Sequence, residues 1–323
     1  MVDYRPLDPA QDYPALAALT NLVATVPVTA GLLQQWVERA DPGRARQQIV
    51  AVDDAGQVIG IGDCVRDTWM PIGQFWVDVI VEPAHRLQGI GAHLFALSEA
   101  WAIANGALYL GDDVRGDQPE GRRFADERGF KPVQHTFEYR LDLTGFSLND
   151  HTARVAELER DGYRFLSFAE AGDSRDHRKA LYKLNKRTIV DDWSFVGSHL
   201  PYQEYCKRMF ESSWSQPDEL MIAAKGSLWV GFTHLANFPA SGMVVSIYTG
   251  VEREYRKQGI ATSLVALSAA HARSRGVQTL RMNIDGRDET MQGIAGRLGA
   301  QGDSGSYRMV KTLPRRPALH GKN

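Results

Sequence analysis

Cysteine is scarce in this sequence, which has only Cys64 and Cys206 among its 323 residues. A disulfide framework is therefore excluded, and two buried structural thiols in a cytoplasmic protein are expected. No uninterrupted apolar stretch approaches the ~20 residues of a membrane span, and the first residues lack the apolar segment of a signal peptide. The formal net charge is -2, so the basic excess typical of proteins that bind nucleic acid or anionic membranes is missing.

Two further absences narrow the chemistry. The nine histidines show no paired spacing of the kind that holds a metal ion, so no metal site is expected. No Ser-His-Asp or Cys-His arrangement stands out, so a covalent acyl-enzyme is not indicated. What remains is a globular composition, with 43% hydrophobic and 24% charged residues, and a length that suggests two domains.

The chain repeats itself. Residues 86–91 read Arg-Leu-Gln-Gly-Ile-Gly and residues 256–261 read Arg-Lys-Gln-Gly-Ile-Ala, and 256 − 86 = 170. Other glycines, and the apolar residues of the following helix, recur in the same register. Several matches in one register across most of a domain indicate a duplication. We therefore predict two domains, residues 1–145 and residues 146–323.

Each copy is predicted to combine strands and helices. In the first copy a hairpin is predicted over residues 48–61, because Asp and Gly separate two apolar runs. A strand over Phe75–Val81 precedes the glycine segment, and a helix from Ile90 to Asn105 follows it. Residues 136–141 are predicted to close the sheet of this copy. The fold class is therefore α/β, or α+β with a mixed sheet, and occurs twice.

The glycine segment has the chemistry of a phosphate-binding turn. The first amides of a helix have no partner within it and point outward at the positive end of the helix dipole. Glycines let the backbone approach a ligand closely and adopt the φ values that such a turn requires. A diphosphate can therefore sit on the amides of residues 88–91, with Arg86 adding charge. The alternative for one copy is a tight strand–helix connection, but the recurrence of the segment favours the phosphate site.

Other nucleotide motifs do not fit this segment. The dinucleotide fingerprint needs a third glycine, and the mononucleotide loop ends in Gly-Lys-Ser/Thr; both features are missing. The sequence instead resembles the GCN5-related N-acetyltransferase (GNAT) superfamily, whose pattern is Arg/Gln-x-x-Gly-x-Gly/Ala after the fourth strand. Both copies satisfy this pattern, with Gly91 and Ala261 at the final position. The resemblance covers nearly the whole chain, as two domains arranged similarly to mycothiol synthase-like proteins.

The resemblance implies acetyl-CoA (coenzyme A) as the cofactor. Its pyrophosphate would bind the glycine segment, and the preceding strand would pair with the pantetheine arm. In the first copy the implied residues are Val79, Ile80, Val81, Arg86, Leu87, Gln88, Gly89, Ile90 and Gly91. In the second copy they are Thr249, Gly250, Val251, Arg256, Lys257, Gln258, Gly259, Ile260 and Ala261. Asn283, at the end of the fifth strand of the second copy, is expected to face the pantetheine.

Both copies depart from the family at one position. Many members have a tyrosine five residues before the Phe of a late Gly-Phe pair, where it can protonate the leaving thiolate. Ala125 and Ala295 stand at that position here. The second copy also has Ala300 in place of the Phe, and Asp288 about where relatives carry a second asparagine. The general acid is therefore another residue, water or none.

Candidates for the chemistry are Asp78 and Tyr248, which occupy matching places on the strands that lead into the two glycine segments. Either side chain can face the acetyl group or be an ordinary sheet residue. Asp191 and Asp192 can recognise a cationic amine, or they can belong to a solvated loop or a helix cap.

These features predict an acetyl-CoA-dependent N-acetyltransferase that moves an acetyl group to a primary amine of a small molecule or peptide by direct attack. The alternative is a coenzyme A-binding regulatory or scaffold protein with one or both domains inactive. We expect the second copy to carry the transfer, because it has Asn283 where the first copy has Asp113, a carboxylate that cannot donate to a pantetheine carbonyl. No nucleic-acid or membrane partner is expected, and the oligomeric state is open.

Overall fold

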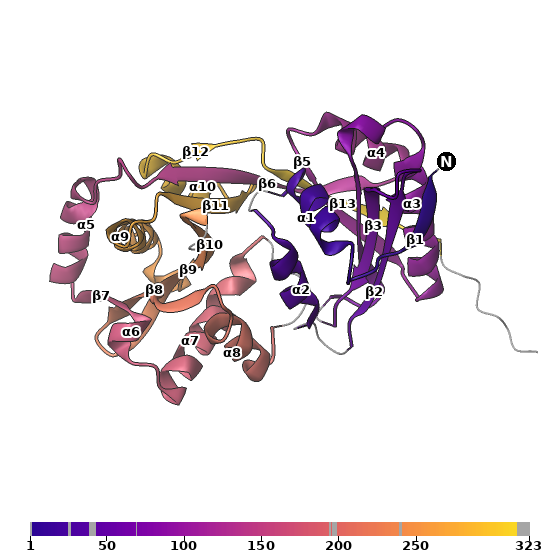
Figure 1. The fold of residues 1–323 in the computed structure, drawn as a ribbon. Helices are drawn as coiled ribbons and strands as arrows, with labels where there is room; N and C mark the ends of the chain where they lie inside the picture. Colours follow the sequence, from indigo (N-terminus) through magenta and orange to yellow (C-terminus); the bar gives the residue numbers. More distant parts are fainter. Residues whose placement is uncertain are drawn as a thin grey trace, which may run out of the picture. The chain divides into compact units, whose positions relative to one another are not determined.

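The structure is a computed structural model that describes residues 2–24, 27–38, 43–68, 70–193, 195, 199–238 and 241–314. It divides into two units, of which the first comprises Met1–His135 with Ser306–Asn323 and the second comprises Thr136–Gly305. The division predicted between residues 145 and 146 follows the repeat in the sequence, whereas these units follow the contacts in the fold. Each unit holds strands and helices of the mixed α/β type, so the predicted fold class is confirmed (Figure 1).

The sheet of the first unit has the order β1-β2-β3-β4-β5-β13. Its strands are β1 (Asp3–Pro6), β2 (Ala45–Val52), β3 (Val58–Arg66), β4 (Gln74–Val81), β5 (Tyr109–Arg115) and β13 (Ser306–Thr312). Neighbouring strands are antiparallel except for β4 and β5, which run parallel. The predicted hairpin is confirmed as β2 and β3, and in its turn Asp53 accepts hydrogen bonds from the amides of Ala55 and Gln57.

Helices cover both faces of this first sheet. They are α1 (Tyr13–Asn21), α2 (Ala30–Glu38), α3 (Ile90–Ala104) and α4 (Pro119–Glu127). On one face, Leu16 of α1 packs with Val50 and Ile61 of the sheet. On the other face, Leu94 of α3 packs with Ile59. The strand that leads into the glycine segment is therefore held between two helical layers.

The sheet of the second unit has the order β6-β11-β10-β9-β8-β7, and β12 pairs with β6. Its strands are β6 (Lys131–Asp142), β7 (Tyr163–Ser167), β8 (Ser215–Lys225), β9 (Leu228–Phe238), β10 (Met243–Val251), β11 (Thr279–Asp285) and β12 (Gln301–Gly302). Here β10 and β11 are the parallel pair, as β4 and β5 are in the first unit. The duplication seen in the sequence is thus also present in the strand directions.

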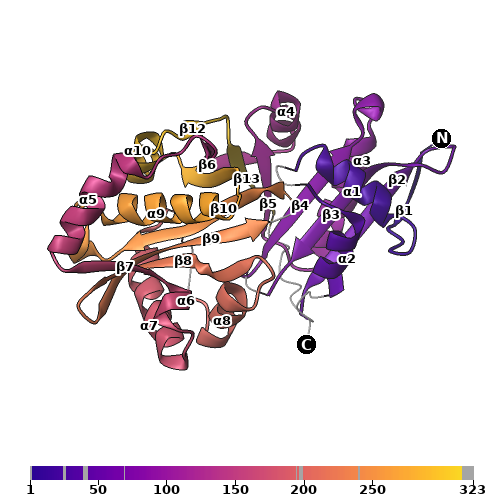
Figure 2. The same cartoon turned by 60° about the vertical axis from the view of Figure 1, so that its left-hand side comes forward.

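Helices again cover both faces of the second sheet. They are α5 (Asn149–Arg160), α6 (Phe168–Ala171), α7 (Arg175–Thr188), α8 (Tyr202–Phe210), α9 (Ile260–Ser274) and α10 (Glu289–Arg297). Leu181 of α7 packs with Ile222 and Phe232 of the sheet. Val265 of α9 packs with Leu235 on the other face. Figure 2 shows α7 and α9 on opposite sides of strands β8 and β9.

The last strand of each copy completes the sheet of the other copy. Residues Thr136–Asp142 of β6 pair antiparallel with β11, from Thr136 with Asp285 to Asp142 with Thr279. In the first unit β13 takes the corresponding place beside β5. The prediction that residues 136–141 close the sheet of the first copy is therefore wrong. Because the two copies are homologous, both sheets offer an equivalent edge, and the local sequence pattern does not distinguish them.

The remaining expectations concern membranes and thiols. None of the helices in the described ranges is both long and apolar enough to cross a membrane. Cys64 is buried in the core of the first unit, as expected. Cys206 on α8 is only half-buried, so the expectation of a buried thiol is wrong there.

Candidate functional site

The two glycine segments have almost the same backbone. Leu87 and Lys257 are the described non-glycine residues with positive φ, at 60° and 61°. Gly89 and Gly259 follow with φ of 83° and 79°, and a helix starts directly after each. Residues with side chains rarely adopt this left-handed conformation, so glycine is favoured at the second of these positions. The sequence repeat therefore encodes two copies of the same turn.

Each turn presents the free end of a helix. No side chain caps α3 or α9, so the first amides of these helices have no acceptor within the helix. The position of the arginine, which the two copies share, has a structural reason as well: Arg86 Nε donates to the Val81 carbonyl at 3.0 Å, and Arg256 Nε donates to the Val251 carbonyl at 2.8 Å. The arginine thus holds the end of the strand beside the turn, and one of its outer nitrogens pairs with a carboxylate: Glu120 for Arg86 and Asp191 for Arg256.

The parallel strands beside each turn diverge. Pairing of β4 with β5 ends at Trp76 and Gly111, although both strands continue. Pairing of β10 with β11 ends at Ser246 and Met282, and β10 has an irregularity directly after that point, before Tyr248. Beyond these residues the facing edges of β4 and β10 have no described strand partner. An extended ligand can pair with such an edge as a strand would.

A cavity of about 690 Å³ opens where β4 and β5 diverge. Its walls include Val77–Val81 of β4, Asp112–Arg115 of β5 and the side of α4. The turn residues Arg86, Leu87 and Gly89 also line it. No atom lies within 4 Å of the position that a Cβ on Gly89 would take, so this turn is open to a ligand. The volume is typical of a site for a small molecule or cofactor.

Two carboxyl groups meet inside this cavity. Asp78 on β4 and Asp112 on β5 are joined by a side-chain hydrogen bond. Burial, with the neighbouring Asp63 as the second cause, raises the pKa of Asp78 to about 7. Burial and the charge of Asp78 raise the pKa of Asp112 well above its ordinary value. The two groups therefore share a proton at neutral pH, and Asp78 is poised to accept another.

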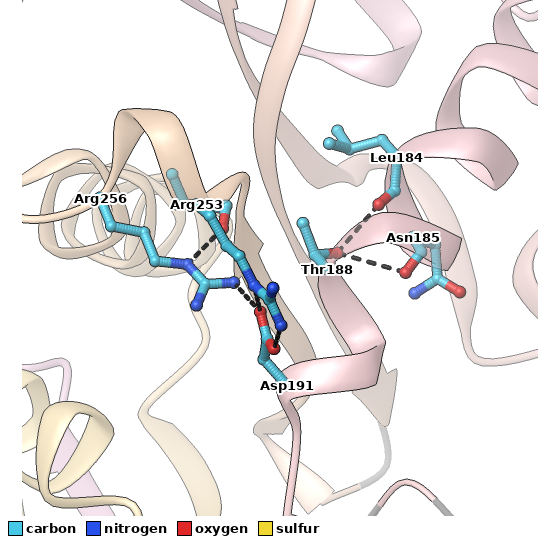
Figure 3. A network of polar contacts seen from close by, with 7 residues as sticks. Leu184, Asn185, Thr188, Asp191, Arg253 and Arg256 are labelled. Carbon is cyan, nitrogen blue, oxygen red and sulfur yellow. Dashed lines mark hydrogen bonds and ion pairs between the residues drawn. The ribbon is translucent and has the colours of Figure 1, made fainter. Parts of the chain in front are cut away.

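The turn of the second copy is held by its own ion pairs. Figure 3 shows Asp191, which follows α7, between Arg253 and Arg256. Arg253 Nε donates to Asp191 at 2.9 Å, and an outer nitrogen of Arg256 donates to it at 2.7 Å. These hydrogen bonds, that of Arg253 first, lower the pKa of Asp191 to about 2. Asp191 is therefore anionic and neutralises cations that a phosphate would otherwise meet.

Arg154 of α5 covers the same turn. Its Nε donates to the Gln258 carbonyl at 3.0 Å and would lie 2.8 Å from a Cβ on Gly259. The Tyr163 hydroxyl donates to the Gln258 side chain at 2.8 Å. Gly89, in contrast, has open space around it. The two turns share a backbone but differ in how far their own chain covers them.

Tyr248 is half-buried and packs against a core cluster of the second unit. Its ring lies against Phe232, with centroids 5.2 Å apart, and fills the space in front of Gly250. Thr188, at the end of α7, hydrogen-bonds to the phenol, and burial raises the pKa of Tyr248 above its ordinary value. The Thr188 hydroxyl also donates to the Leu184 carbonyl at 3.0 Å (Figure 3). These contacts fit the interpretation of Tyr248 as a sheet residue better than that of a mobile proton donor.

Comparison with known proteins identifies the family. The chain matches the acetyltransferase (GNAT) family over residues 17–130 and again over residues 179–299. It belongs to the GNAT family. The predicted resemblance, including the tandem arrangement, is thereby confirmed.

Individual relatives agree with this assignment. A mycothiol acetyltransferase from Thermobispora bispora is 25% identical over 218 residues, and the match spans 64% of this chain and 66% of that protein. A tandem GNAT protein from the clavulanic acid biosynthesis pathway has the same fold, with a TM-score of 0.75 at 16% identity over 98% of this chain and 100% of that one. A GCN5-related N-acetyltransferase from Sphaerobacter thermophilus has a TM-score of 0.74 at 19% identity, covering 96% and 95% of the two chains.

The structure also places the other residues singled out in the sequence. Asn283 lies on β11 and is exposed. In the strand pairing it stands opposite Glu138 of the neighbouring strand β6. Ala125 and Ala295, at the position of the family's tyrosine, are buried on α4 and α10. Asp192, next to Asp191, is half-buried. No group of His, Cys, Asp and Glu side chains in the described part of the chain could hold a metal ion.

Sequence reasoning missed Asp112 and Arg154. Asp112 follows the apolar start of β5, and an acidic residue inside a strand there is a signal that could have been used. Its meeting with Asp78 depends on where β4 and β5 stop pairing, which no local pattern reports. Arg154 lies more than 100 residues before the turn it covers, and an arginine on the helix between the copies carries no signal of its own.

Proposed function

We propose that this GNAT protein is an acetyl-CoA-dependent N-acetyltransferase and that the transfer takes place in the first copy. The observation that carries the proposal is the cavity beside an open glycine turn, with Asp78 and Asp112 inside it. The acceptor is a primary amine of a small molecule or peptide. This reverses the expectation that the second copy carries the transfer, because the second turn is covered by Arg154 and its Tyr248 packs against a core cluster.

The residues of the first copy fit the cofactor. A diphosphate would accept hydrogen bonds from the first amides of α3, with Arg86 and Arg123 of the cavity wall supplying positive charge. The pantetheine arm would pair with the edge of β4 at Val79–Val81, which β5 leaves free. That path brings the acetyl end toward Asp78, where the strands part. The cofactor supplies a thioester, whose carbonyl carbon is the electrophile.

The chain's own groups can perform the rest. Backbone amides on the free edge of β4 would donate to the thioester oxygen and stabilise the negative charge that develops there. Asp78, with its pKa near neutrality, would take a proton from the amine. Direct attack by the amine needs no nucleophile from the protein, which agrees with the lack of cysteine and serine among the residues of the cavity wall.

The second copy is proposed to bind coenzyme A or to act as a structural partner. Its turn has the correct backbone, and Arg154, Arg253 and Arg256 gather cations around it. Asp191 and Arg154 would have to move before a diphosphate could reach the amides. A regulatory role for this copy is the alternative left by the sequence. A cytoplasmic location is proposed for the whole protein.

The name of the relative from Thermobispora bispora, a mycothiol acetyltransferase, supports acetyl transfer as the reaction. The match spans 66% of that relative's length, so we do not assign the relative's particular acceptor to this protein. We propose the chemical class only: a primary amine that is protonated in solution.

Substitution at the turn glycines tests the assignment. Gly89→Asp places a carboxylate in the seat of the diphosphate, whereas Gly89→Asn has the same shape without the charge, and both residues tolerate positive φ. We expect Gly89→Asp to lower kcat/KM for thioester turnover with a panel of amines by more than tenfold relative to Gly89→Asn. A tenfold loss corresponds to about 1.4 kcal/mol.

The same pair of substitutions at Gly259 is the matched control. Gly259→Asp and Gly259→Asn should differ little in turnover, although calorimetry with coenzyme A should find one site fewer in the aspartate variant. Loss of turnover in Gly259→Asp alone would return the transfer to the second copy. Coenzyme A binding without turnover of any amine would support the regulatory alternative.

A further inference from the structure

The hydrogen bond between Asp78 and Asp112 is the feature that the assignment to a family leaves unexplained. The last paired residues of β4 and β5 are Trp76 and Gly111, so both aspartates lie just beyond the point of divergence. Alternation along β5 puts Asp112 on the same face as Leu110 and Val114, which pack in the core of the first unit. Asp112 therefore approaches Asp78 from the face of the sheet that α3 covers, and both aspartates line the cavity.

Among the described residues, the other carboxylates around the Asp78–Asp112 pair each have an arginine partner. Asp63, the cross-strand partner of Asp78, accepts a hydrogen bond from Arg46 Nε at 2.9 Å. Asp113, next to Asp112, pairs with Arg308 at 3.2 Å. The other carboxylates of the cavity wall pair with arginines too: Asp117 with Arg115, Glu120 with Arg86, and Glu127 with Arg123 and Arg128. In the described part of the chain, neither Asp78 nor Asp112 forms an ion pair with a lysine or an arginine.

A carboxyl pair without a cation can be held together only if it keeps a proton. Burial raises the pKa of both groups; Asp63 and Asp113 add to the effect, and Arg46 opposes it for Asp78. The hydrogen bond between them lowers the pKa of Asp78 and raises that of Asp112, which is the pattern of Asp112 as the donor and Asp78 as the acceptor. A cationic ligand would supply the positive charge that the pair lacks.

The cavity wall offers no other proton carrier near neutrality. Among the described residues that line it, there is no tyrosine, serine, threonine, cysteine, histidine or lysine. Ala125, which stands where many family members have the thiolate-protonating tyrosine, is part of this wall. Protons that move within the cavity must therefore pass through its carboxyl groups or through water.

We propose that Asp112 is a positioning residue that keeps its proton and donates it in a hydrogen bond to Asp78, so that Asp78 binds the acceptor's ammonium group and takes up its proton. The inference rests on the proposed transfer in the first copy and adds Asp112 to the residues that take part in it. It also names the acceptor's state on arrival: a primary ammonium ion, R–NH3+, rather than a neutral amine or a hydroxyl.

The proton balance of the step closes. R–NH3+ gives one proton to the Asp78 carboxylate and becomes R–NH2. The nitrogen lone pair then forms the C–N bond to the thioester carbon, the C–S bond breaks, and its electron pair leaves with the sulfur of coenzyme A. The new amide nitrogen releases its extra proton to water, and Asp78 returns its proton to the thiolate. The net change is R–NH3+ and acetyl-CoA to the acetamide, coenzyme A and one H+, with the hydrogen bond from Asp112 unchanged throughout.

The second copy lacks the pair. Tyr248 stands 170 residues after Asp78, and Met282 stands 170 residues after Asp112 (248 − 78 and 282 − 112). Met282 is fully buried in the core of the second unit. The aspartate pair is therefore not part of the repeated scaffold and belongs to the copy that holds the 690 Å³ cavity.

Replacements of Asp112 test the inference in the full-length protein. Asp112→Asn keeps a neutral hydrogen-bond donor, so the pH profile of kcat/KM should retain its rise near pH 7. Asp112→Leu removes the donor, so the rise should move to higher pH by about one unit or more, since the carboxylate of Asp78 loses its stabilising partner. Asp78→Asn should lower kcat by about 10²-fold or more, as loss of a general base typically does. Asp126→Asn, an exposed aspartate of α4 outside the cavity wall, is the control and should leave activity unchanged.

A second measurement does not depend on turnover. In protein with 13C-labelled aspartate side chains, one carboxyl resonance should titrate near pH 7 in the wild type and in Asp112→Asn, and should disappear in Asp78→Asn. A rise that moves to lower pH in Asp112→Asn would mean that Asp112 is an anion, and would overturn the inference. So would the lack of any carboxyl titration between pH 6 and pH 8. If the resonance titrates as expected but no amine is acetylated, the proposed function fails while the proton-sharing pair stands.

Discussion

At the scale of single residues, the Asp78–Asp112 pair opposes folding at neutral pH. A carboxyl group whose pKa rises on folding binds its proton more tightly in the native chain than in the unfolded chain. Its contribution to the free energy of unfolding therefore falls as the pH rises from the unfolded pKa, near 4, to the folded pKa of Asp78, about 7. Such a cost is typical of functional sites, where a group is kept for its chemistry.

Asp78→Asn should therefore stabilise the protein, and more so at high pH. Each pKa unit corresponds to about 1.4 kcal/mol, so the gain in unfolding free energy at pH 8 should exceed that at pH 5 by up to about 3 kcal/mol. Urea denaturation at the two pH values measures the difference. Asp126→Asn, whose carboxylate is exposed beside Arg122, should show no such dependence. An equal effect of Asp78→Asn at both pH values would contradict the raised pKa.

The glycine turns show how far residue-level prediction reaches. Gly89 and Gly259 could be predicted because a strand, a turn and a helix start follow one another in a short segment, and the local backbone geometry favours glycine there. Asp78 could be singled out because it lies on the strand that enters the turn. For Asp112 the sequence offers only an acidic residue after an apolar run, because its contact with Asp78 depends on the pairing of two strands that are separated by a helix.

At the scale of elements, β6 is anchored in the second sheet by a buried ion pair. Glu138 of β6 is 5% exposed, and Arg281 of β11 is 8% exposed. Arg281 Nε lies 2.7 Å from the Glu138 carboxylate, which also accepts a hydrogen bond from Arg140 Nε at 2.7 Å. The pair fixes which residues of β6 and β11 face each other. Glu138 thus contributes to the register as well as to the strength of this contact.

Removal of Glu138 should destabilise the second unit strongly. Glu138→Ala leaves the guanidinium of Arg281 buried without its carboxylate, and breaking such a pair typically costs about 3–5 kcal/mol. Arg140→Ala, the control, removes a side chain that is 54% exposed and should cost at most about 1 kcal/mol. Urea transitions of the two full-length variants measure the contrast. Similar losses in both variants would show that the buried pair has no special weight.

At the scale of the whole molecule, the exchange of the last strands between the two copies could not be predicted from the sequence. The pattern of residues 136–141 correctly predicts a strand, and the partial burial of these residues agrees with a place in a sheet. Homologous copies, however, offer homologous edges, so the same strand satisfies either sheet. The choice depends on the connection lengths and on side chains such as Glu138 and Arg281, which a repeat comparison does not evaluate. The consequence is that each unit of the fold needs residues from both halves of the sequence.

The exchange makes the site in the first copy dependent on the end of the described chain. Strand β13 pairs with β5 from Ser306 with Arg115 to Thr312 with Tyr109. Met309 of β13 is fully buried in the core that also contains Phe75 and Val77 of β4. Loss of β13 would expose the edge of β5, which forms one wall of the cavity. A division of the chain at residues 145 and 146 into self-sufficient domains implies the opposite, since it assigns β13 to the second copy.

A truncation separates these two implications. In a Gly259→Asp background, where calorimetry reports the first site alone, a chain that ends at Gly305 should lose acetyl-CoA binding by at least tenfold. A chain that ends at Pro314 keeps β13 and serves as the control. Addition of a synthetic peptide of residues 306–314 to the shorter chain should restore part of the affinity, because the peptide can fill the vacant place beside β5 and bury Met309 again. Equal binding by the two truncated chains would mean that the first copy completes its own sheet, as the repeat alone suggests.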